Sequence, residues 1–228
     1  MAFKPVAMHL HALPEGSSSI SRLQLTAARM GYSSIVVGNH HDSPEPEGAR
    51  LPITEIYGSV EIRIDSASKL SRIIPTLRNE YDILAVHGDN ASVFRTAIEN
   101  SRVDVVCHTH RVHNGVNHVL ARLASRHNVA MEFSYGPIIR LRGSERERML
   151  RDQASILALQ RKYEFPYVVA GGAWSHYDIR APRDVEALCA TFGMEPEEVR
   201  LGLDHYPRAI LKRSRDENRL GEGVYLCE

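Results

Sequence analysis

Residues 103–134 read VDVVCHTHRVHNGVNHVLARLASRHNVAMEFS, and this stretch contains the unit that predicts the fold. Its two ends, 103–108 and 129–134, are short apolar runs of the length and β-branched content expected of buried strands. Between them, apolar residues at helical spacings of three and four predict a helix over 116–128. A strand, a helix and a strand in this order indicate parallel strands joined by a crossover helix.

The same unit recurs along the chain. Further strands are predicted at 6–11, 34–40, 59–65, 83–87 and 167–170. Further helices are predicted at 20–31, 67–81, 146–163, 185–192 and 196–203. About seven repeats favour a TIM-barrel-like parallel α/β barrel with outer helices over an open doubly wound sheet, because no Gly-rich nucleotide loop follows the first strand. We assign 1–211 to this single barrel domain and 212–228 to a polar C-terminal tail, and we expect 42–52, with three prolines, to form a surface loop.

The composition is that of an ordinary globular chain. Of the 228 residues, 43% are hydrophobic and 25% are charged. No apolar run approaches the roughly 20 residues that cross a bilayer, and the first residues do not resemble a signal peptide. We therefore expect a cytoplasmic protein with no membrane partner. Cys107, Cys189 and Cys227 lie far apart without a CxxC pair, which argues against a disulfide framework and a zinc ribbon.

Basic residues are concentrated in the middle of a chain whose formal net charge is zero. Residues 100–163 carry 11 Arg or Lys against 5 Asp or Glu. Arginine accounts for 24 of the 28 basic residues, and its planar fork binds phosphate through two hydrogen bonds. The bias is explained equally well by selection for phosphate binding or by a genome that favours arginine codons.

Histidines cluster at the predicted strand ends. Nine of the twelve lie at or just past such an end: His9, His11, His40, His41, His87, His108, His110, His113 and His176. The carboxyl ends of barrel strands open onto one face, so these imidazoles are expected to converge there with nearby carboxylates. Such a donor set suits Zn, Mn or Fe. The alternative is that each histidine simply bonds backbone or an RNA phosphate. The candidate metal ligands are His9, His11, His40, Glu61, His87 and His108.

The first half of the chain resembles the polymerase and histidinol phosphatase (PHP) family. The resemblance lies in HLHALPEG at 9–16, VVGNHHD at 36–42, GSVEI at 58–62, VHGD at 86–89 and CHTHR at 107–111. It implies a distorted α/β barrel with a metal cluster that hydrolyses phosphate esters, and it matches the six candidate ligands. The chain departs from the pattern in two places. Asn39 replaces an Asp, and Ala173 and Ser175 replace the late Asp-x-His, although His176 or Asp178 could compensate.

The second half resembles protein component 3 of archaeal ribonuclease P, and the two resemblances together cover residues 6–213. It is carried by NHVLARLA at 117–124, GGA at 171–173, DIRAPRD at 178–184 and YPRAILKR at 206–213. This family is itself PHP-like in fold, usually without metal ligands. The resemblance implies a subunit that binds the catalytic RNA with a small RNA-binding-fold partner protein. The RNA, with its Mg²⁺, then removes the 5′ leader of precursor tRNA.

Arginines near the predicted strand ends are the candidate RNA contacts, because phosphate contacts supply most of the affinity for RNA. We predict contacts from Arg111, His118, Arg122, Arg140, Arg142, Arg180 and Arg183. Trp174 and Tyr177 are expected to close the barrel mouth, or else to stack on a base.

Three functions are therefore compared. The leading hypothesis is a subunit of ribonuclease P. The alternatives are a free-standing PHP-type metal-dependent phosphoesterase, with Zn or Mn at the histidines, and a protein-interaction scaffold.

Overall fold

A seven-stranded parallel sheet forms the centre of the computed structural model, which describes residues 2–112, 115–214, 219–221 and 224–225. The strands follow one another in chain order around the sheet. They are β1 (Val6–Leu10), β2 (Ser34–Val37), β3 (Glu55–Ile62), β4 (Ile83–His87), β5 (Val105–Cys107), β6 (Ala130–Ser134) and β7 (Tyr167–Ala170). The predictions for β4 and β7 match residue for residue, whereas β3 begins four residues earlier than predicted.

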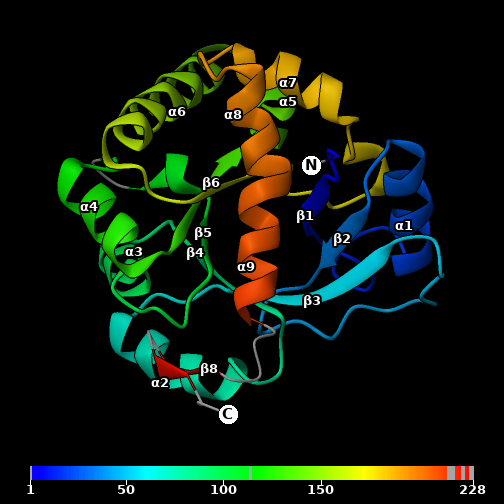
Figure 1. Cartoon of the computed structure of the whole chain (residues 1–228), viewed down its shortest axis with the longest axis horizontal. Helices are drawn as coiled ribbons and strands as arrows, with labels where there is room; N and C mark the ends of the chain where they lie inside the picture. The colour runs from blue at the N-terminus through cyan, green and yellow to red at the C-terminus, as the bar shows by residue number, and fades with distance from the viewer. Residues whose placement is uncertain (1, 113–114, 215–218, 222–223, 226–228) are drawn as a thin grey trace.

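The sheet curls into a nearly closed barrel with helices around it (Figure 1). Closure between β1 and β7 is made just past the strand ends. There the backbone N–H of Ala173 donates to the His9 carbonyl at 3.0 Å, and the His11 N–H donates to the Ala173 carbonyl at 2.8 Å. The predicted barrel is therefore confirmed.

The outer layer consists of the crossover helices, each of which buries one apolar stripe against the strands. They are α1 (Ile20–Arg29), α2 (Ala67–Leu77), α3 (Ala91–Ile98), α4 (His118–His127), α5 (Gly136–Arg140), α6 (Gly143–Tyr163) and α7 (Pro182–Ala190). Helices α3 and α5 were not predicted. Residues 42–52 contain no helix or strand, which confirms the predicted loop. Among the described residues, no helix is both long and apolar enough to cross a bilayer.

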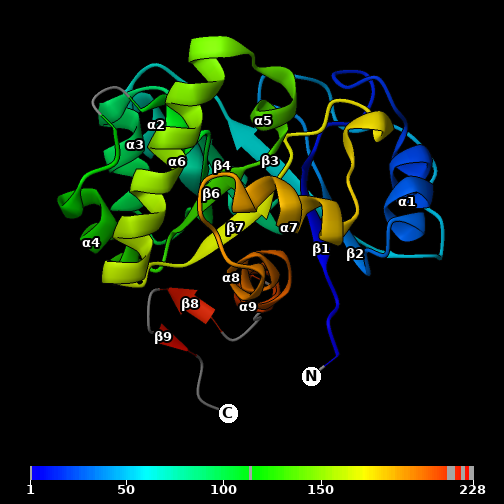
Figure 2. The same ribbon diagram turned by 90° about the horizontal axis from the view of Figure 1, so that it is seen from above.

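A helical rod closes the end of the barrel at which the strands begin (Figures 1 and 2). It consists of α8 (Pro196–Arg200), the π-helical turn η3 (Leu201–His205) and α9 (Tyr206–Ser214). Ile210 and Leu211 of α9 pack onto inward-facing strand residues such as Val6 and Ile83. The interior at this end is therefore apolar core, and the carboxyl ends of the strands lie at the opposite end.

The sequence did not predict α9. Its last residues, 212–214, fall inside the segment assigned to a polar tail. Two short strands, β8 (Arg219–Gly221) and β9 (Val224–Tyr225), pair in antiparallel fashion further along that segment, and its remaining residues lie outside the described ones. The domain boundary at residue 211 stays a prediction.

Candidate functional site

The carboxyl ends of β1 to β5 bring all six candidate metal ligands into one buried cluster. Their side chains are between 2% and 16% exposed. They are His9, His11, His40, Glu61, His87 and His108. The strand-end reasoning therefore located these groups correctly, since residues up to 99 positions apart in the chain converge.

Two of the histidines adopt a strained backbone conformation. The φ angles of His9 and His108 are 60° and 55°, in the left-handed region that non-glycine residues seldom occupy. The pairing of β1 with β2 also shifts register between Ala7 and Leu10. Such conformations cost about 1 to 3 kcal/mol each and persist where the surrounding structure enforces them, which is a common property of functional sites.

The imidazole Nε2 atoms point inward to the Glu61 carboxylate. Nε2 of His9 and of His40 each lie 3.2 Å from Glu61 Oε2, and Nε2 of His11 lies 3.6 Å from the same oxygen. On the other oxygen, Oε1, the Nε2 atoms of His108 and His87 lie at 3.4 Å and 4.0 Å. Five imidazole rings thus surround the one carboxylate of Glu61.

The Nδ1 atoms point outward to a second ring of carboxylates. Glu132 Oε2 lies 2.6 Å from Nδ1 of His9, and Asp89 Oδ2 lies 2.9 Å from Nδ1 of His87. Glu15 serves two histidines. Its oxygens lie 2.6 Å from Nδ1 of His40 and 3.2 Å from Nδ1 of His11 (the latter four residues earlier in the chain). The sequence analysis missed Glu15, although a carboxylate at this spacing from an HxH pair was a usable signal.

The electrostatics keep the central carboxylates ionised. Burial alone would raise the pKa of Glu61 and Glu132, but the neighbouring His9 outweighs it. The pKa of Glu61 is therefore held well below its usual range, and that of Glu132 falls to about 2. For His11, burial is the largest influence and lowers the pKa to about 4. His11 is therefore neutral at pH 7, the form in which an imidazole binds a metal.

These residues fit a transition-metal ion. The ligand atoms of His9, His11 and Glu61 lie within 4.8 Å of one another, as do those of His40, Glu61 and His87. Neutral imidazole with carboxylate is a donor set that suits Zn, Mn or Fe. In addition, Glu61 Oε1 and His40 Nε2 are buried and form no hydrogen bond. Such atoms require an explanation, and an ion that they coordinate would supply one.

Ala173 and Asn39, which stand where the PHP family has metal ligands, instead make contacts that hold the fold together. Ala173 is fully buried and closes the barrel, and the Asn39 side chain bonds the Ala12 N–H and the Pro44 carbonyl. Neither proposed substitute joins the cluster. His176 Nδ1 lies 2.9 Å from the Ser18 hydroxyl, and Asp178 accepts hydrogen bonds from two backbone N–H groups at 3.0 Å. The late Asp-x-His position is therefore not compensated.

Aromatic side chains lie over part of the cluster. The Trp174 ring stacks on His11 with centroids 4.6 Å apart and planes at 24°, and it lies tilted 6.2 Å from His40. The Tyr177 ring instead lies tilted beside His176, with ring centroids 3.9 Å apart, and remains 76% exposed. Trp174 therefore covers the mouth as expected, whereas Tyr177 projects away from the structure.

Among the described residues, the remaining strand-end histidines do not lie against Glu61. His110 lies beside His108, with ring centroids 6.2 Å apart. His41 faces an outer hollow together with Asp42 and Arg63. His113 lies outside the described residues. The prediction that strand-end histidines converge thus holds for five of them, whereas the side chains of His41, His110 and His176 make other contacts.

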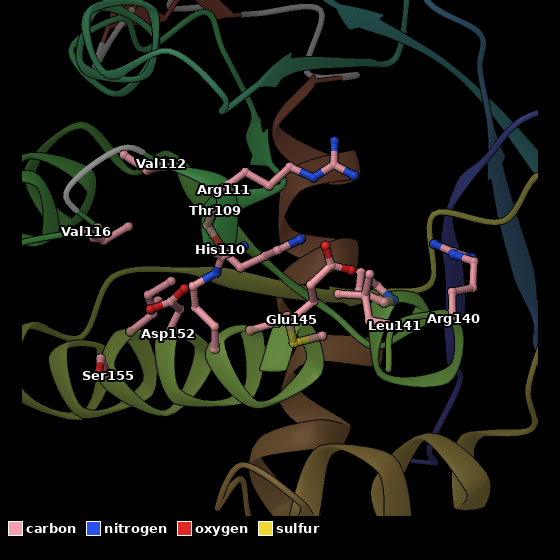
Figure 3. A pocket seen from close by; sticks show the side chains of 15 residues that line it. Thr109, His110, Arg111, Val112, Val116, Arg140, Leu141, Glu145, Asp152 and Ser155 are labelled. Atoms are coloured by element: carbon pink, nitrogen blue, oxygen red, sulfur yellow. The ribbon is translucent and has the colours of Figure 1, made fainter. Parts of the chain in front are cut away.

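A groove of about 820 Å³ lies beside the barrel mouth (Figure 3). Its walls come from the 3-10 turn η1 (Thr109–Arg111), α5 and α6. Arg111 and Arg140 line it, and in Figure 3 both guanidinium groups extend away from α6. Arg148, which the sequence analysis did not select, also lines it, together with Glu145. The groove therefore presents several cations to one space.

The other five candidate RNA contacts lie elsewhere. His118 and Arg122 line a separate hollow on α4 that includes Tyr163. The Arg142 guanidinium donates to the carbonyl of Leu141 at 2.9 Å, and Arg180 donates to that of Tyr177 at 2.6 Å. Arg183 is exposed at the start of α7. Sequence position alone could not separate arginines that line the groove from arginines that cap local carbonyls.

The fold and the histidine–carboxylate cluster define a PHP-like barrel whose ligand set is incomplete. Solved structures agree on the fold. A chain in the cryo-EM structure of archaeal ribonuclease P with mature tRNA superposes with a TM-score of 0.77 at 23% identity, covering 97% of this chain and 98% of that one. Histidinol phosphate phosphatase from Lactococcus lactis, complexed with Zn, L-histidinol and phosphate, gives 0.54 at 10% identity over 94% and 95%.

Sequence comparison is more specific. Ribonuclease P protein component 3 of Methanococcoides burtonii is 36% identical over 97% of this chain and 93% of that protein. The Methanosarcina mazei counterpart is 35% identical over 96% and 94%. A family model, RNase P subunit p30, matches residues 6–219. The chain therefore belongs to the RNase P subunit p30 family, as its motifs predicted.

Proposed function

We propose that this chain is a protein subunit of ribonuclease P. It binds the catalytic RNA together with other protein subunits, among them a small RNA-binding-fold partner, and supports removal of the 5′ leader from precursor tRNA. The cleavage chemistry then resides in the RNA and its Mg²⁺, within a cytoplasmic ribonucleoprotein. Family membership over residues 6–219 supports this role.

The observation that carries the proposal is the arginine-lined groove at the barrel mouth. The Arg111 side chain is 54% exposed, and its nearest carboxylate, Asp89, lies 4.0 Å away at the limit of an ion pair. Arg140 and Arg148 are exposed on the same groove. Exposed arginines with weak internal partners can neutralise phosphates and release counterions, which drives association with a folded RNA. A wide groove suits RNA recognition by shape and backbone.

The two alternative functions have less support. A PHP-type phosphoesterase needs substrate access to its metals, whereas the candidate ligands here are at most 16% exposed and lack the late Asp-x-His. A protein-interaction scaffold would call for an apolar patch without surrounding arginines, and the groove beside the mouth is instead charged.

Reconstitution of ribonuclease P tests the proposal. Omission of the chain is expected to lower the rate of precursor tRNA cleavage, or to raise the Mg²⁺ concentration that cleavage requires. Full activity at the same Mg²⁺ concentration without the chain would refute the proposal. The double variant Arg111→Ala, Arg140→Ala should reproduce part of the loss. Arg151→Ala is the matched control, because Arg151 lies on the surface of α6 paired with Glu147 at 2.9 Å.

A further inference from the structure

The imidazoles at the barrel mouth are held in one orientation. For His9, His11 and His40, Nδ1 faces an outer carboxylate while Nε2 faces Glu61. At His40, where Nδ1 faces Glu15 and Nε2 is buried without a hydrogen-bond partner, the inward nitrogen is free to bind a cation. Outer carboxylates that fix the tautomer of inward imidazoles are typical of metal sites.

The hydrogen bonding at the centre is incomplete in the same place. Glu61 Oε1 is buried without a hydrogen-bond partner, although Nε2 of His108 lies 3.4 Å away. His40 Nε2 is also buried without a partner that is aligned for a hydrogen bond. Buried polar atoms in native proteins nearly always have partners. Both of these atoms face the centre of the cluster, where an ion would coordinate them.

A small cavity lies inside the barrel beside part of the cluster. It has a volume of about 20 Å³ and lies against His9, Glu61, Cys107 and Glu132. That volume holds roughly one water molecule or one ion. The groove of about 820 Å³ beside the mouth is lined by none of the six candidate ligands. Trp174 stacks over His11 at the mouth. The groove does not reach the candidate ligands, and Trp174 covers part of the mouth above them.

We propose that the cluster around Glu61 holds a structural transition-metal ion, Zn²⁺ or Mn²⁺, between His40, Glu61 and His87, which joins the carboxyl ends of β2, β3 and β4 and has no hydrolytic role. Glu15 and Glu132 are positioning residues that hold the imidazoles of His40 and His9 from outside. Because the carboxyl ends of β2, β3 and β4 each contribute one ligand to this group, a bound ion would cross-link three segments that are far apart in the sequence.

Metal binding to the isolated full-length chain tests this proposal. The chain is stripped with chelator and reloaded with Zn²⁺ or Mn²⁺, and the bound metal is counted by elemental analysis after gel filtration. Stoichiometric metal and a rise in Tm of about 5 °C or more are expected. A chain that retains no metal, or one whose Tm does not respond, overturns the proposal. Turnover of p-nitrophenyl phosphate by the loaded chain would overturn the structural role.

Variants assign the roles within the cluster. Glu61→Gln should abolish stoichiometric binding, and Glu15→Gln should weaken it about 10- to 100-fold. Glu147→Gln, on the exposed surface of α6, is the control and should bind like the original chain. Co²⁺ gives a second readout, because its visible spectrum reports the coordination and it quenches Trp174, the chain's one tryptophan. Unchanged Co²⁺ spectra and affinity in Glu15→Gln would contradict the positioning role.

These measurements are independent of the ribonuclease P role, because they use no RNA and no partner protein. A chain that binds metal yet does not affect precursor tRNA cleavage would refute only the proposed function. A chain that supports cleavage without binding metal would refute only the metal centre.

Discussion

The Nδ1 atom of His40 lies 2.6 Å from Oε1 of Glu15, and this contact joins the loop after β1 to the loop after β2. The same carboxylate accepts hydrogen bonds from the His40 backbone N–H at 2.8 Å and from the Ser43 hydroxyl at 2.9 Å. Burial would raise the pKa of Glu15, but these hydrogen bonds outweigh it and lower the pKa. Glu15 therefore holds the imidazoles of His11 and His40 and also fixes the loop after β2 through the His40 backbone and Ser43.

Replacement of Glu15 by Gln should destabilise the chain even without metal. The amide cannot accept with both of its terminal atoms, so a donor at the His40 backbone or at Ser43 loses its partner. We expect a loss of about 1 to 3 kcal/mol in the free energy of unfolding, measured by urea denaturation in chelator. Glu80→Gln, on an exposed turn, should leave the urea midpoint unchanged. Equal midpoints for the two variants would contradict this prediction.

Removal of a groove arginine should weaken RNA binding in a salt-dependent way. Arg140→Ala removes one phosphate contact, so the slope of log K against log salt should fall by about 1, with little dependence on RNA sequence. Binding of ribonuclease P RNA is measured at several salt concentrations. Arg151→Ala should keep the slope of the original chain. An unchanged slope in Arg140→Ala would remove Arg140 from the interface.

Asp104 should be the most sensitive buried charge outside the mouth. One of its oxygens accepts from Arg78 and from the Leu84 backbone N–H, and the other accepts from Arg213 of α9 at 3.0 Å. Asp104→Ala leaves two guanidinium groups without this partner and loosens the floor of the barrel. A loss of about 3 to 5 kcal/mol is expected in equilibrium unfolding. A change below about 1 kcal/mol would show that the network adds little.

Alanine substitutions at Gly38 and Gly58 test whether β2 and β3 approach too closely for a side chain at Gly38. A Cβ at Gly38, just past β2, would lie 1.9 Å from the backbone oxygen of Ser59, whereas a Cβ at Gly58 in β3 meets nothing closer than 3.9 Å. Gly38→Ala must therefore move β2 away from β3 and should lower Tm by several degrees, at about 2 to 4 °C per kcal/mol for a chain of this size. Gly58→Ala should leave Tm within about 2 °C. Similar Tm values for both variants would contradict the prediction that a Cβ at Gly38 collides with the Ser59 backbone.

The sequence indicated most of the fold because its signals there are local. Strand runs, helical spacings and the proline-rich loop are properties of short windows, so β4 and β7 were predicted residue for residue. Helix α9 was missed because its sequence looks polar. Its burial rests on Ile210 and Leu211, which meet strand residues distant in the chain.

The sequence by itself determined the repeating strand–helix unit, and with it the parallel barrel and the gathering of strand-end histidines on one face. Only the tertiary structure decided that Glu61 lies at their centre, that Glu15 and Glu132 hold the imidazoles from outside, and that Ala173 closes the barrel. The reason is physical. Periodicity fixes which side of a strand a residue faces, whereas the approach of His9 to Glu132, 123 residues apart, depends on how loops and side chains pack once the barrel has closed.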